Sequence, residues 1–391
     1  MSEWREVTLS ELGKFSSGKP ITPGQPGEFK AYGANGVIGG SDEARYGSGI
    51  IVGRVGAYCG AVAVSHEPFW ASDNTIVIEP AIDEDLDYLG CLLRSAQLHR
   101  HAGGAAQPLV TQGILKALRF RVPGPDVRVC IGQVMAVFDD LIENNRRRIE
   151  LLEEMARAIY REWFVKFRYP GHEDVPMVDS VLGPIPEGWE VVPASTLITV
   201  NPRIKLDKSV KHPFITMGDL DEGSLSCRPS DVRAGGSGTK FELGDTLFAR
   251  ITPCLQNGKT GLVQSLAVGE VGMGSTEFIV LRGRLVGSAY TYCLARDEHF
   301  RGHAISSMSG ASGRQRVRNE CFDSYLIAAP PGGLSDEFED TAEPLLLQAK
   351  VLFDESGRLG ALRDALLPKL VTGQIDVSTL DLDALFAEQV A

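Results

Sequence analysis

The feature that most constrains this chain is an internal repeat, with the two copies roughly 185–210 residues apart. Three strings of the first half have counterparts in the same order in the second half: GSGIIVGRVG (47–56) with LGDTLFARIT (243–252), ASDNTIVIEP (71–80) with GSTEFIVLRG (274–283), and YLGCLLRSAQLHRH (88–101) with YTYCLARDEHFRGH (290–303). The first two pairs have the pattern of strands and the third that of a short helix. The repeat therefore predicts two similar globular domains in one chain.

A long amphipathic segment follows the β-rich part of each half. In residues 127–169 and again in 334–375, apolar side chains recur at spacings of three and four. Each segment predicts a helix of about 45–55 Å, which is longer than one compact domain requires. The two helices would bury their apolar stripes against each other as a coiled coil. Pro344 is expected in the first turn of the second helix, and the residues predicted for the packed seam are Phe138, Leu141, Ile149, Leu152, Ile159, Leu352, Leu359 and Leu366.

These patterns together predict an α+β fold. Two similar domains with mixed, twisted β-sheets would be separated by two long antiparallel helices that form a coiled-coil spacer, with pseudo-two-fold symmetry. The predicted segments are a first target-recognition domain (1–126), a central long-helix region (127–169), a linker (170–187), a second target-recognition domain (188–333), a second long-helix region (334–375) and an acidic tail (376–391).

The charge is acidic overall but unevenly distributed. The chain has 39 Lys and Arg against 51 Asp and Glu, a net charge of −12, which argues against simple electrostatic adhesion to nucleic acid. Residues 201–334, however, hold 16 basic and 13 acidic residues, a net of +3. No stretch approaches the roughly 20 apolar residues of a membrane span, and the first residues lack a secretory signal. Seven cysteines without a CxxC pair are typical of reduced thiols, so we expect a cytoplasmic location.

The sequence contains no recognisable catalytic constellation. It has no GxxxxGK[ST] phosphate loop, no dinucleotide-binding GxGxxG, no HExxH and no GxSxG elbow. His299 and His303 have the spacing of helical metal ligands, but no third ligand accompanies them, and surface or capping roles explain them better. Cys254 fits a buried thiol. We therefore expect no catalytic residue and no bound metal. The chain is expected to recognise a partner and not to react with it.

Loops of both halves carry the residue types that contact DNA. Arginine pairs with guanine, asparagine and glutamine pair with adenine, and lysine contacts phosphate. For either loop of the second half taken alone, an ordinary solvated loop is the better explanation. Two such loops in one domain, repeated in weaker form in the other half, bring DNA contact level with it. The candidate DNA-binding residues are Lys19, Tyr32, Asn35, Arg54 and Gln107 in the first half, and Lys205, Arg250, Gln256, Asn257, Lys259, Arg314, Gln315 and Arg316 in the second.

Several strings together carry a family resemblance. They are YGANGVIG, IIVGRVGAYCG and WASDNT in the first half, and FARITPCLQNGK, GSTEFIVLR and SGASGRQRV in the second. With these, and with the helical IGQVMAVFDDLIENNRRRIELLEEMARAIYREWF and LPKLVTGQIDV, essentially the whole chain resembles the DNA-specificity (S) subunits of type I restriction–modification systems.

The resemblance implies a non-catalytic subunit that binds double-stranded DNA. Each domain would read one half of a bipartite target, and the helices would set the spacing and dock two adenine-N6 methyltransferase subunits. S-adenosylmethionine, ATP and Mg²⁺ would be bound by partner subunits, with no cofactor on this chain, and the presence of restriction (translocase and nuclease) subunits is left open. The alternative is an interaction scaffold of a related assembly in which DNA recognition has degenerated.

Overall fold

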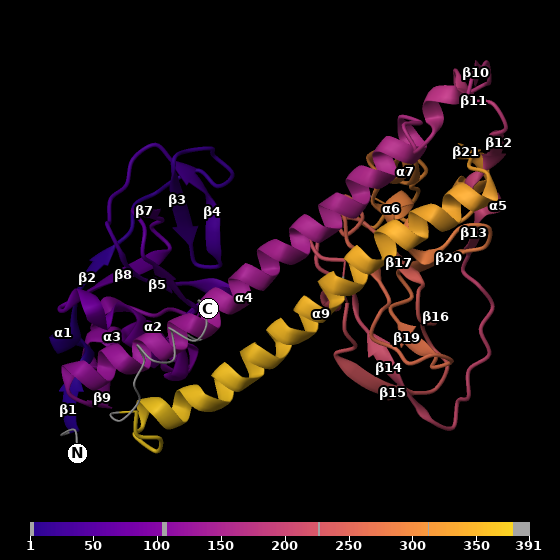
Figure 1. Ribbon diagram of the computed structural model, residues 1–391. Coiled ribbons are helices and arrows are strands. Elements are labelled where there is room, and N and C mark those ends of the chain that lie inside the picture. Colours follow the sequence, from indigo (N-terminus) through magenta and orange to yellow (C-terminus); the bar gives the residue numbers. More distant parts are fainter. Residues whose placement is uncertain (1–3, 104–107, 226, 312, 378–391) are drawn as a thin grey trace. The chain divides into compact units, whose positions relative to one another are not determined.

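The protein is seen in a computed structural model that describes residues 4–103, 108–225, 227–311 and 313–377 (Figure 1). The chain divides into two compact units. Unit 1 comprises Met1–Glu143 with Gly357–Ala391, and unit 2 comprises Asn144–Ser356. Each unit thus contains one β-rich domain and a part of each long helix.

Unit 1 is built on a four-stranded antiparallel sheet. Its strand order is β2 (Gly13–Ser17), β8 (Thr75–Pro80), β5 (Gly49–Gly53), β6 (Val62–Ser65). The central strand β5 is a continuous apolar run that is buried on both faces. Ile50 and Val52 belong to the larger core with helix α2 (Leu86–Ser95), whereas Ile51 points to a smaller core with Phe69. Because side chains alternate between the two faces of a strand, β5 contributes residues to two separate cores, one on each face of the sheet.

The smaller core of unit 1 lies against a three-stranded sheet, in the order β4 (Gly36–Ser41), β3 (Phe29–Gly33), β7 (Phe69–Ala71). Strands β3 and β4 form a hairpin, and β3 pairs with β7 in parallel. A two-stranded ribbon of β1 (Arg5–Thr8) and β9 (Arg119–Val122) closes the domain. The short helices are α1 (Leu9–Leu12) and α3 (Gln112–Ala117).

Unit 2 repeats this topology, with one additional strand, β16 (Thr239–Phe241), at the edge of its second sheet. Its first sheet has the order β13 (Ile198–Val200), β20 (Phe278–Gly283), β17 (Thr246–Ala249), β18 (Thr260–Leu262). Its second sheet has the order β15 (Asp231–Ala234), β14 (Lys211–Ile215), β19 (Gly272–Gly274), β16 (Thr239–Phe241), and β14 pairs with β19 in parallel as β3 does with β7. The closing ribbon is β12 (Glu190–Pro193) with β21 (Leu326–Ala329). The internal repeat seen in the sequence is thus a repeat of the fold.

The remaining elements of unit 2 complete the correspondence. Helix α6 (Ser288–Arg296) takes the place of α2, and it is followed by α7 (Glu298–Ser306). The short helices α5 (Ala194–Leu197) and α8 (Cys321–Ser324) correspond to α1 and α3. A hairpin of β10 (Met177–Val178) and β11 (Ile185–Pro186) lies inside the segment predicted as a plain linker.

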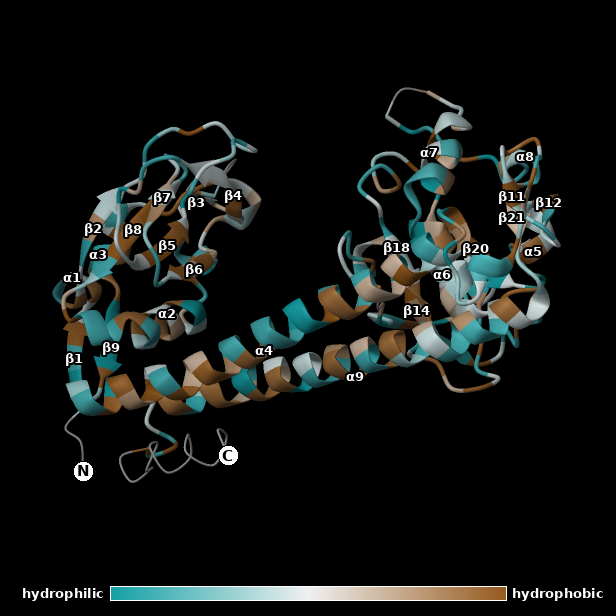
Figure 2. Cartoon of the chain, turned by 45° about the horizontal axis from the view of Figure 1, so that its top comes forward, coloured by the Kyte–Doolittle hydropathy of each residue, from teal (hydrophilic) through white to brown (hydrophobic). Residues whose placement is uncertain are grey.

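The two long helices are α4 (Pro125–Tyr160), which continues as a π-helical turn over Arg161–Val165, and α9 (Gly332–Val371). Within each unit their segments run antiparallel and side by side, with apolar positions recurring along both (Figure 2). In unit 1, the Arg363 guanidinium binds Asp139 at 2.6 Å. In unit 2, Asn145 Nδ2 donates to Glu355 Oε2 at 3.3 Å. Further along unit 2, Tyr160 on α4 packs against Phe338 on α9. The contact position on α4 thus rises from 145 to 160 while that on α9 falls from 355 to 338, which confirms that the two helices run antiparallel in this unit.

The predicted seam residues differ in how deeply they pack. Ile149 and Leu352 are buried in the core of unit 2, with Leu152 and Ile159 packed against it. Phe138 and Leu366 pack against the core of unit 1. Leu141 and Leu359 are only half-buried, and neither belongs to the hydrophobic core of its unit.

One detail of the helix prediction was wrong. Because α9 begins at Gly332, Pro344 lies well inside the helix rather than in its first turn. The helix tolerates it because Ala342 and Leu346 on either side are buried in the core, so packing outweighs the missing backbone donor. Within the central region, the chain leaves the helix after Val165, and Phe167 has a positive φ of 59°. Most of the predicted acidic tail, residues 378–391, lies outside the described residues.

No helix in the described part of the chain combines the length and the apolar character that crossing a bilayer requires. All seven cysteines are free thiols.

Candidate nucleic-acid interface

In unit 1 the predicted residues gather around one turn, between β7 and β8. The backbone N–H of Lys19 donates to the carbonyl of Ala71 at 2.9 Å, and the N–H of Arg54 donates to the carbonyl of Asn74 at 2.9 Å. The carbonyl of Tyr32 accepts from Ser72 N–H at 2.8 Å. Three segments far apart in sequence are therefore held at the same end of the sheet.

Lys19 and Asn35 present exposed side chains at this end, and Arg54 is half-exposed. Asn35 lies in the turn between β3 and β4, which approaches the end of β5 so closely that a Cβ on Gly53 would lie 2.8 Å from the carbonyl oxygen of Ala34. Gln107 lies outside the described residues.

Tyr32 requires a correction, because the residue is only 8% exposed. It packs edge-to-face against Phe69, with 5.5 Å between ring centroids. The alternation of side chains in β3 directs it into the small core, so it offers no stacking face to a base. Its role is to support the hairpin that carries Asn35.

Unit 2 presents the same construction around the corresponding turn, between β19 and β20. The N–H of Arg250 donates to the carbonyl of Glu277 at 3.0 Å, as Arg54 does to Asn74. The carbonyl of Arg250 accepts from Val317 N–H at 2.9 Å, and that of Arg54 accepts from Val110 N–H at the same distance. Each unit thus attaches a second loop, before Val110 or before Val317, to the end of its central strand.

The Arg250 side chain is engaged within the protein. Its Nη2 donates to the carbonyl of Val317 at 2.9 Å, while its buried Nε–H has no hydrogen-bond partner among the described residues. Arg250 therefore anchors the loop that carries Arg314, Gln315 and Arg316.

Arg316 makes a two-pronged ion pair with Glu277. Its Nε and Nη2 lie 2.9 Å and 2.6 Å from the carboxylate oxygens. Hydrogen bonds from Arg316 hold the pKa of the Glu277 carboxyl below its ordinary value. A phosphate or a base must compete with this carboxylate for the guanidinium.

Three other basic or amide side chains are less constrained. Arg314 and Lys205 are exposed, and their charged groups make no hydrogen bond or ion pair within the described part of the chain. Gln315 is half-exposed, and its backbone carbonyl accepts from Thr252 N–H at 3.1 Å. These side chains are free to contact a ligand without breaking an internal interaction.

The 250–259 loop, between β17 and β18, is packed against the 217–223 segment. Asn257 Nδ2 donates to Glu222 Oε1 at 2.7 Å, and Lys259 Nζ donates to the carbonyl of Met217 at 3.1 Å. Gln256 Nε2 donates to Thr252 Oγ1 at 3.2 Å. The predicted side chains of this loop thus have internal partners.

Sequence reasoning missed these acidic partners. Glu277 lies 39 residues before Arg316, and Glu222 lies 35 residues before Asn257. No local pattern joins either pair. The one available signal is the repeat itself, which places Glu277 at the same position in its turn as Asn74.

In the part of the chain that the structure describes, no group of His, Cys, Asp and Glu is arranged to hold a metal ion. His303 Nε2 lies 2.9 Å from the carbonyl of Cys321, which is the local role expected for a surface histidine.

Comparisons with known proteins agree with this architecture. Residues 1–154 match the profile of the family described as type I restriction modification DNA specificity domain. The specificity subunit of the type I restriction enzyme MjaIX from Methanocaldococcus jannaschii is 24% identical over 340 residues, which cover 82% of this chain and 76% of that protein. The EcoEI specificity subunit of Escherichia coli is 30% identical over 154 residues, which are 38% of this chain and 26% of that protein.

Among solved structures, the type I restriction-modification S subunit from M. genitalium aligns over 94% of this chain and 96% of its own, with a TM-score of 0.58 at 14% identity. That likeness shows a shared α+β fold with long helices. Over most of its length this chain is therefore similar to type I restriction–modification DNA-specificity subunits, and its residues 1–154 match the DNA specificity domain of that family.

Proposed function

We propose that each unit of this chain reads one half of a bipartite DNA target. The observation that supports this most is the repeated construction in which the same turn, in units 1 and 2, gathers polar and basic side chains from separate loops. A double-stranded target read at two places is what dimeric DNA-binding proteins recognise with two chains. Here one chain supplies both readers.

The contacts proposed for unit 2 follow from which cations are free. Arg314 and Lys205 are exposed without an internal ion pair in the described residues, so they would contact DNA first. Arg316 would join them when its Glu277 partner is displaced. In unit 1, Lys19, Asn35 and Arg54 would play the corresponding roles.

The long helices would set the distance between half-sites and dock two adenine-N6 methyltransferase subunits. Their outward faces carry large apolar side chains that are unusual for a solvated helix: Leu151 (62% exposed) and Met155 (44%) on α4, and Leu347 (47%) and Val351 (62%) on α9. Partner subunits would cover these residues. The partner subunits would also bind S-adenosylmethionine, ATP and Mg²⁺. This chain itself would be non-catalytic and would bind no cofactor. The complex would act in the cytoplasm.

The test is methylome sequencing of cells that express this chain with a cognate methyltransferase subunit, compared with cells that lack this chain. We expect a split, asymmetric N6-methyladenine motif that disappears on deletion. Unchanged methylation, with the methyltransferase shown to be active, would contradict the proposal.

A second candidate is an interaction scaffold with degenerate recognition. It is favoured by the internal acidic partners of Arg316 and Asn257, because these contacts bind the recognition loops to the protein itself and not to DNA. Assembly with a methyltransferase but no sequence preference in the methylation pattern would support this candidate.

A further inference from the structure

We propose that Arg296 is a positioning residue for DNA reading by unit 2. Through Glu153 it would fix the 250–259 loop to helix α4, so that the specificity of this unit's half-site depends on a buried ion pair remote from the DNA. The inference rests on the proposed DNA-reading function and adds a specificity-determining pair to it.

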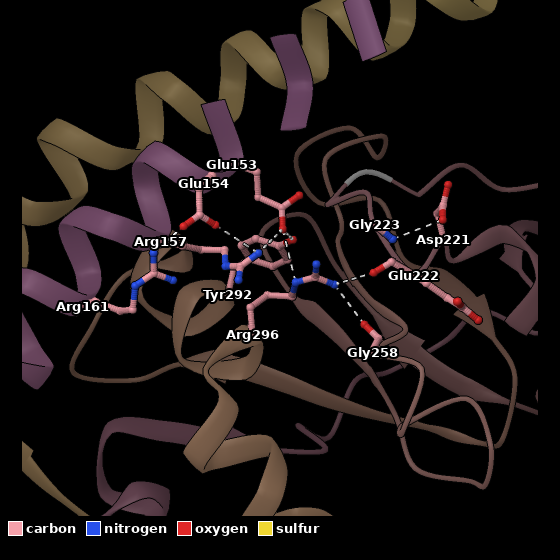
Figure 3. A network of polar contacts seen from close by, with 10 residues as sticks. All are labelled: Glu153, Glu154, Arg157, Arg161, Asp221, Glu222, Gly223, Gly258, Tyr292 and Arg296. Carbon is pink, nitrogen blue, oxygen red and sulfur yellow. Dashed lines mark hydrogen bonds and ion pairs between the residues drawn. The ribbon is translucent and has the colours of Figure 1, made fainter. Parts of the chain in front are cut away.

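Arg296 ends helix α6 and is only 8% exposed (Figure 3). Its Nε lies 3.2 Å from Glu153 Oε1 on α4, and the Tyr292 hydroxyl donates to the same oxygen at 2.7 Å. Glu153 is 2% exposed. The carboxylate is therefore held by two groups from α6.

The other end of the guanidinium holds two loops together. Nη1 donates to the carbonyl of Gly258 at 2.9 Å and to that of Glu222 at 3.2 Å. The first carbonyl belongs to the 250–259 loop and the second to the 217–223 segment on which that loop packs. Gly258 has a φ of 83°, in the left-handed region that favours glycine, which sets the direction of its carbonyl.

This arrangement needs the planar fork of arginine. A single guanidinium spans a carboxylate and two carbonyls, whereas a lysine ammonium is a point charge on a flexible stem. The loop held in this way carries Gln256, Asn257 and Lys259, and its base is hydrogen-bonded to Gln315 through Thr252. Displacement of the loop would move several candidate base contacts together.

The internal repeat supplies a matched control. Arg94 occupies the position of Arg296 in the corresponding string of unit 1. It also binds a carboxylate of α4, Asp139, at 2.7 Å, but within the described residues its guanidinium reaches no loop carbonyl. Among the residues that the structure describes, the loop contact is therefore found in unit 2 and not in unit 1.

The experiment compares methylation motifs produced by the assembled complex with this chain or its variants. We expect Arg296→Lys to relax one half of the motif, with discrimination against a single-base mismatch in that half falling roughly ten-fold or more, as for loss of a base contact. The other half should stay unchanged. Arg94→Lys should leave both halves unchanged.

A triple variant, Glu153→Met with Tyr292→Phe and Arg296→Met, separates positioning from folding. Replacing a buried ion pair with apolar side chains is often neutral for stability. Arg157, which also lies 3.8 Å from Glu153, keeps the Glu154 carboxylate at 3.6 Å as its partner in this variant. We expect this variant to keep near-normal thermal unfolding and yet to relax the same half-site. Full discrimination in both halves, in either the lysine or the triple variant, would overturn the inference. Equal relaxation of both halves would also overturn it, because that result indicates a global defect. Absence of a bipartite motif with the unaltered chain would instead refute the proposed function, and this inference with it.

Discussion

Leucine-to-alanine substitutions at two positions of α9 test the packing of the long helices. Leu352 is 5% exposed in the core of unit 2, whereas Leu347, five residues earlier on the same helix, is 47% exposed. Both changes have the same intrinsic effect on helix propensity, so their difference measures burial alone.

The magnitude follows from burial. A buried Leu→Ala change costs about 2–5 kcal/mol through lost apolar transfer and the cavity left behind. The seam between two helices can partly close, so we expect about 3 kcal/mol for Leu352→Ala. For a unit of this size, at about 2–4 °C per kcal/mol, the melting temperature should fall by roughly 6–12 °C. Leu347→Ala should change stability by less than about 0.5 kcal/mol.

Thermal and urea unfolding followed by circular dichroism measure both variants, and co-purification with the methyltransferase subunit measures docking. We expect Leu352→Ala to lower stability, and Leu347→Ala to weaken docking instead. Equal stability losses at the two positions would refute the assignment of a buried seam and an exposed docking face.

Three further predictions concern charged residues. Arg314→Ala should weaken binding to the cognate site by about 1–3 kcal/mol in a DNA titration, as expected for a side chain that contacts a base. An equal, small loss on cognate and random DNA would indicate that Arg314 contacts a phosphate or no DNA group at all. Glu277→Gln should tighten DNA binding several-fold by releasing Arg316. Because the pKa of Glu277 lies below its ordinary value, this acid stays ionised from about pH 5 to 8, and its ion pair is lost only as the pH falls through the lowered pKa. The gain in affinity of the variant over the unaltered chain should therefore be constant across that range. A gain that vanishes at pH 5 would contradict the assignment. Arg128→Met should destabilise unit 1 by about 3–5 kcal/mol, because it leaves the buried Asp85 carboxylate, whose Oδ2 lies 2.8 Å from Arg128 Nη2, without its partner. Adding Asp85→Leu should restore most of this loss, measured by urea unfolding. No recovery would show that the pair itself is strongly stabilising.

The fold was predictable because periodicity and repetition are local properties of the sequence. The apolar run of β5 and the three- and four-residue spacing in α4 each indicate their element without knowledge of distant residues. The correspondence between the two halves then predicts matching topology, and the sheets confirm it.

Partners that lie far apart in sequence could not be predicted. The acidic start of the second long helix is one example: Glu339 accepts hydrogen bonds from the N–H groups of Ala289 and Tyr290 at 3.0 Å and 2.8 Å, so it caps helix α6. The sequence shows only an acidic stretch there. Tyr32 is another example, because whether an aromatic ring faces solvent or a second small core depends on a sheet that only the fold reveals.

The side chains of the candidate interface were predictable by type but not by availability. Arg314 and Arg316 are neighbours with the same chemistry, yet one is free in the described structure and the other is paired with Glu277. Only the spatial meeting of the turn before β20 with the 309–317 loop distinguishes them.

The central claim is that two similar units read two half-sites at a distance set by the helices. The most direct measurement is the methylation motif of a variant with seven residues inserted in α4 between residues 143 and 144 and seven in α9 between residues 356 and 357. Seven residues keep the apolar stripe nearly in phase and lengthen each helix by about 10.5 Å, close to three base pairs at about 3.4 Å each. We predict the same two half-sites separated by about three additional base pairs. An unchanged gap, or altered half-sites at the original gap, would contradict the account.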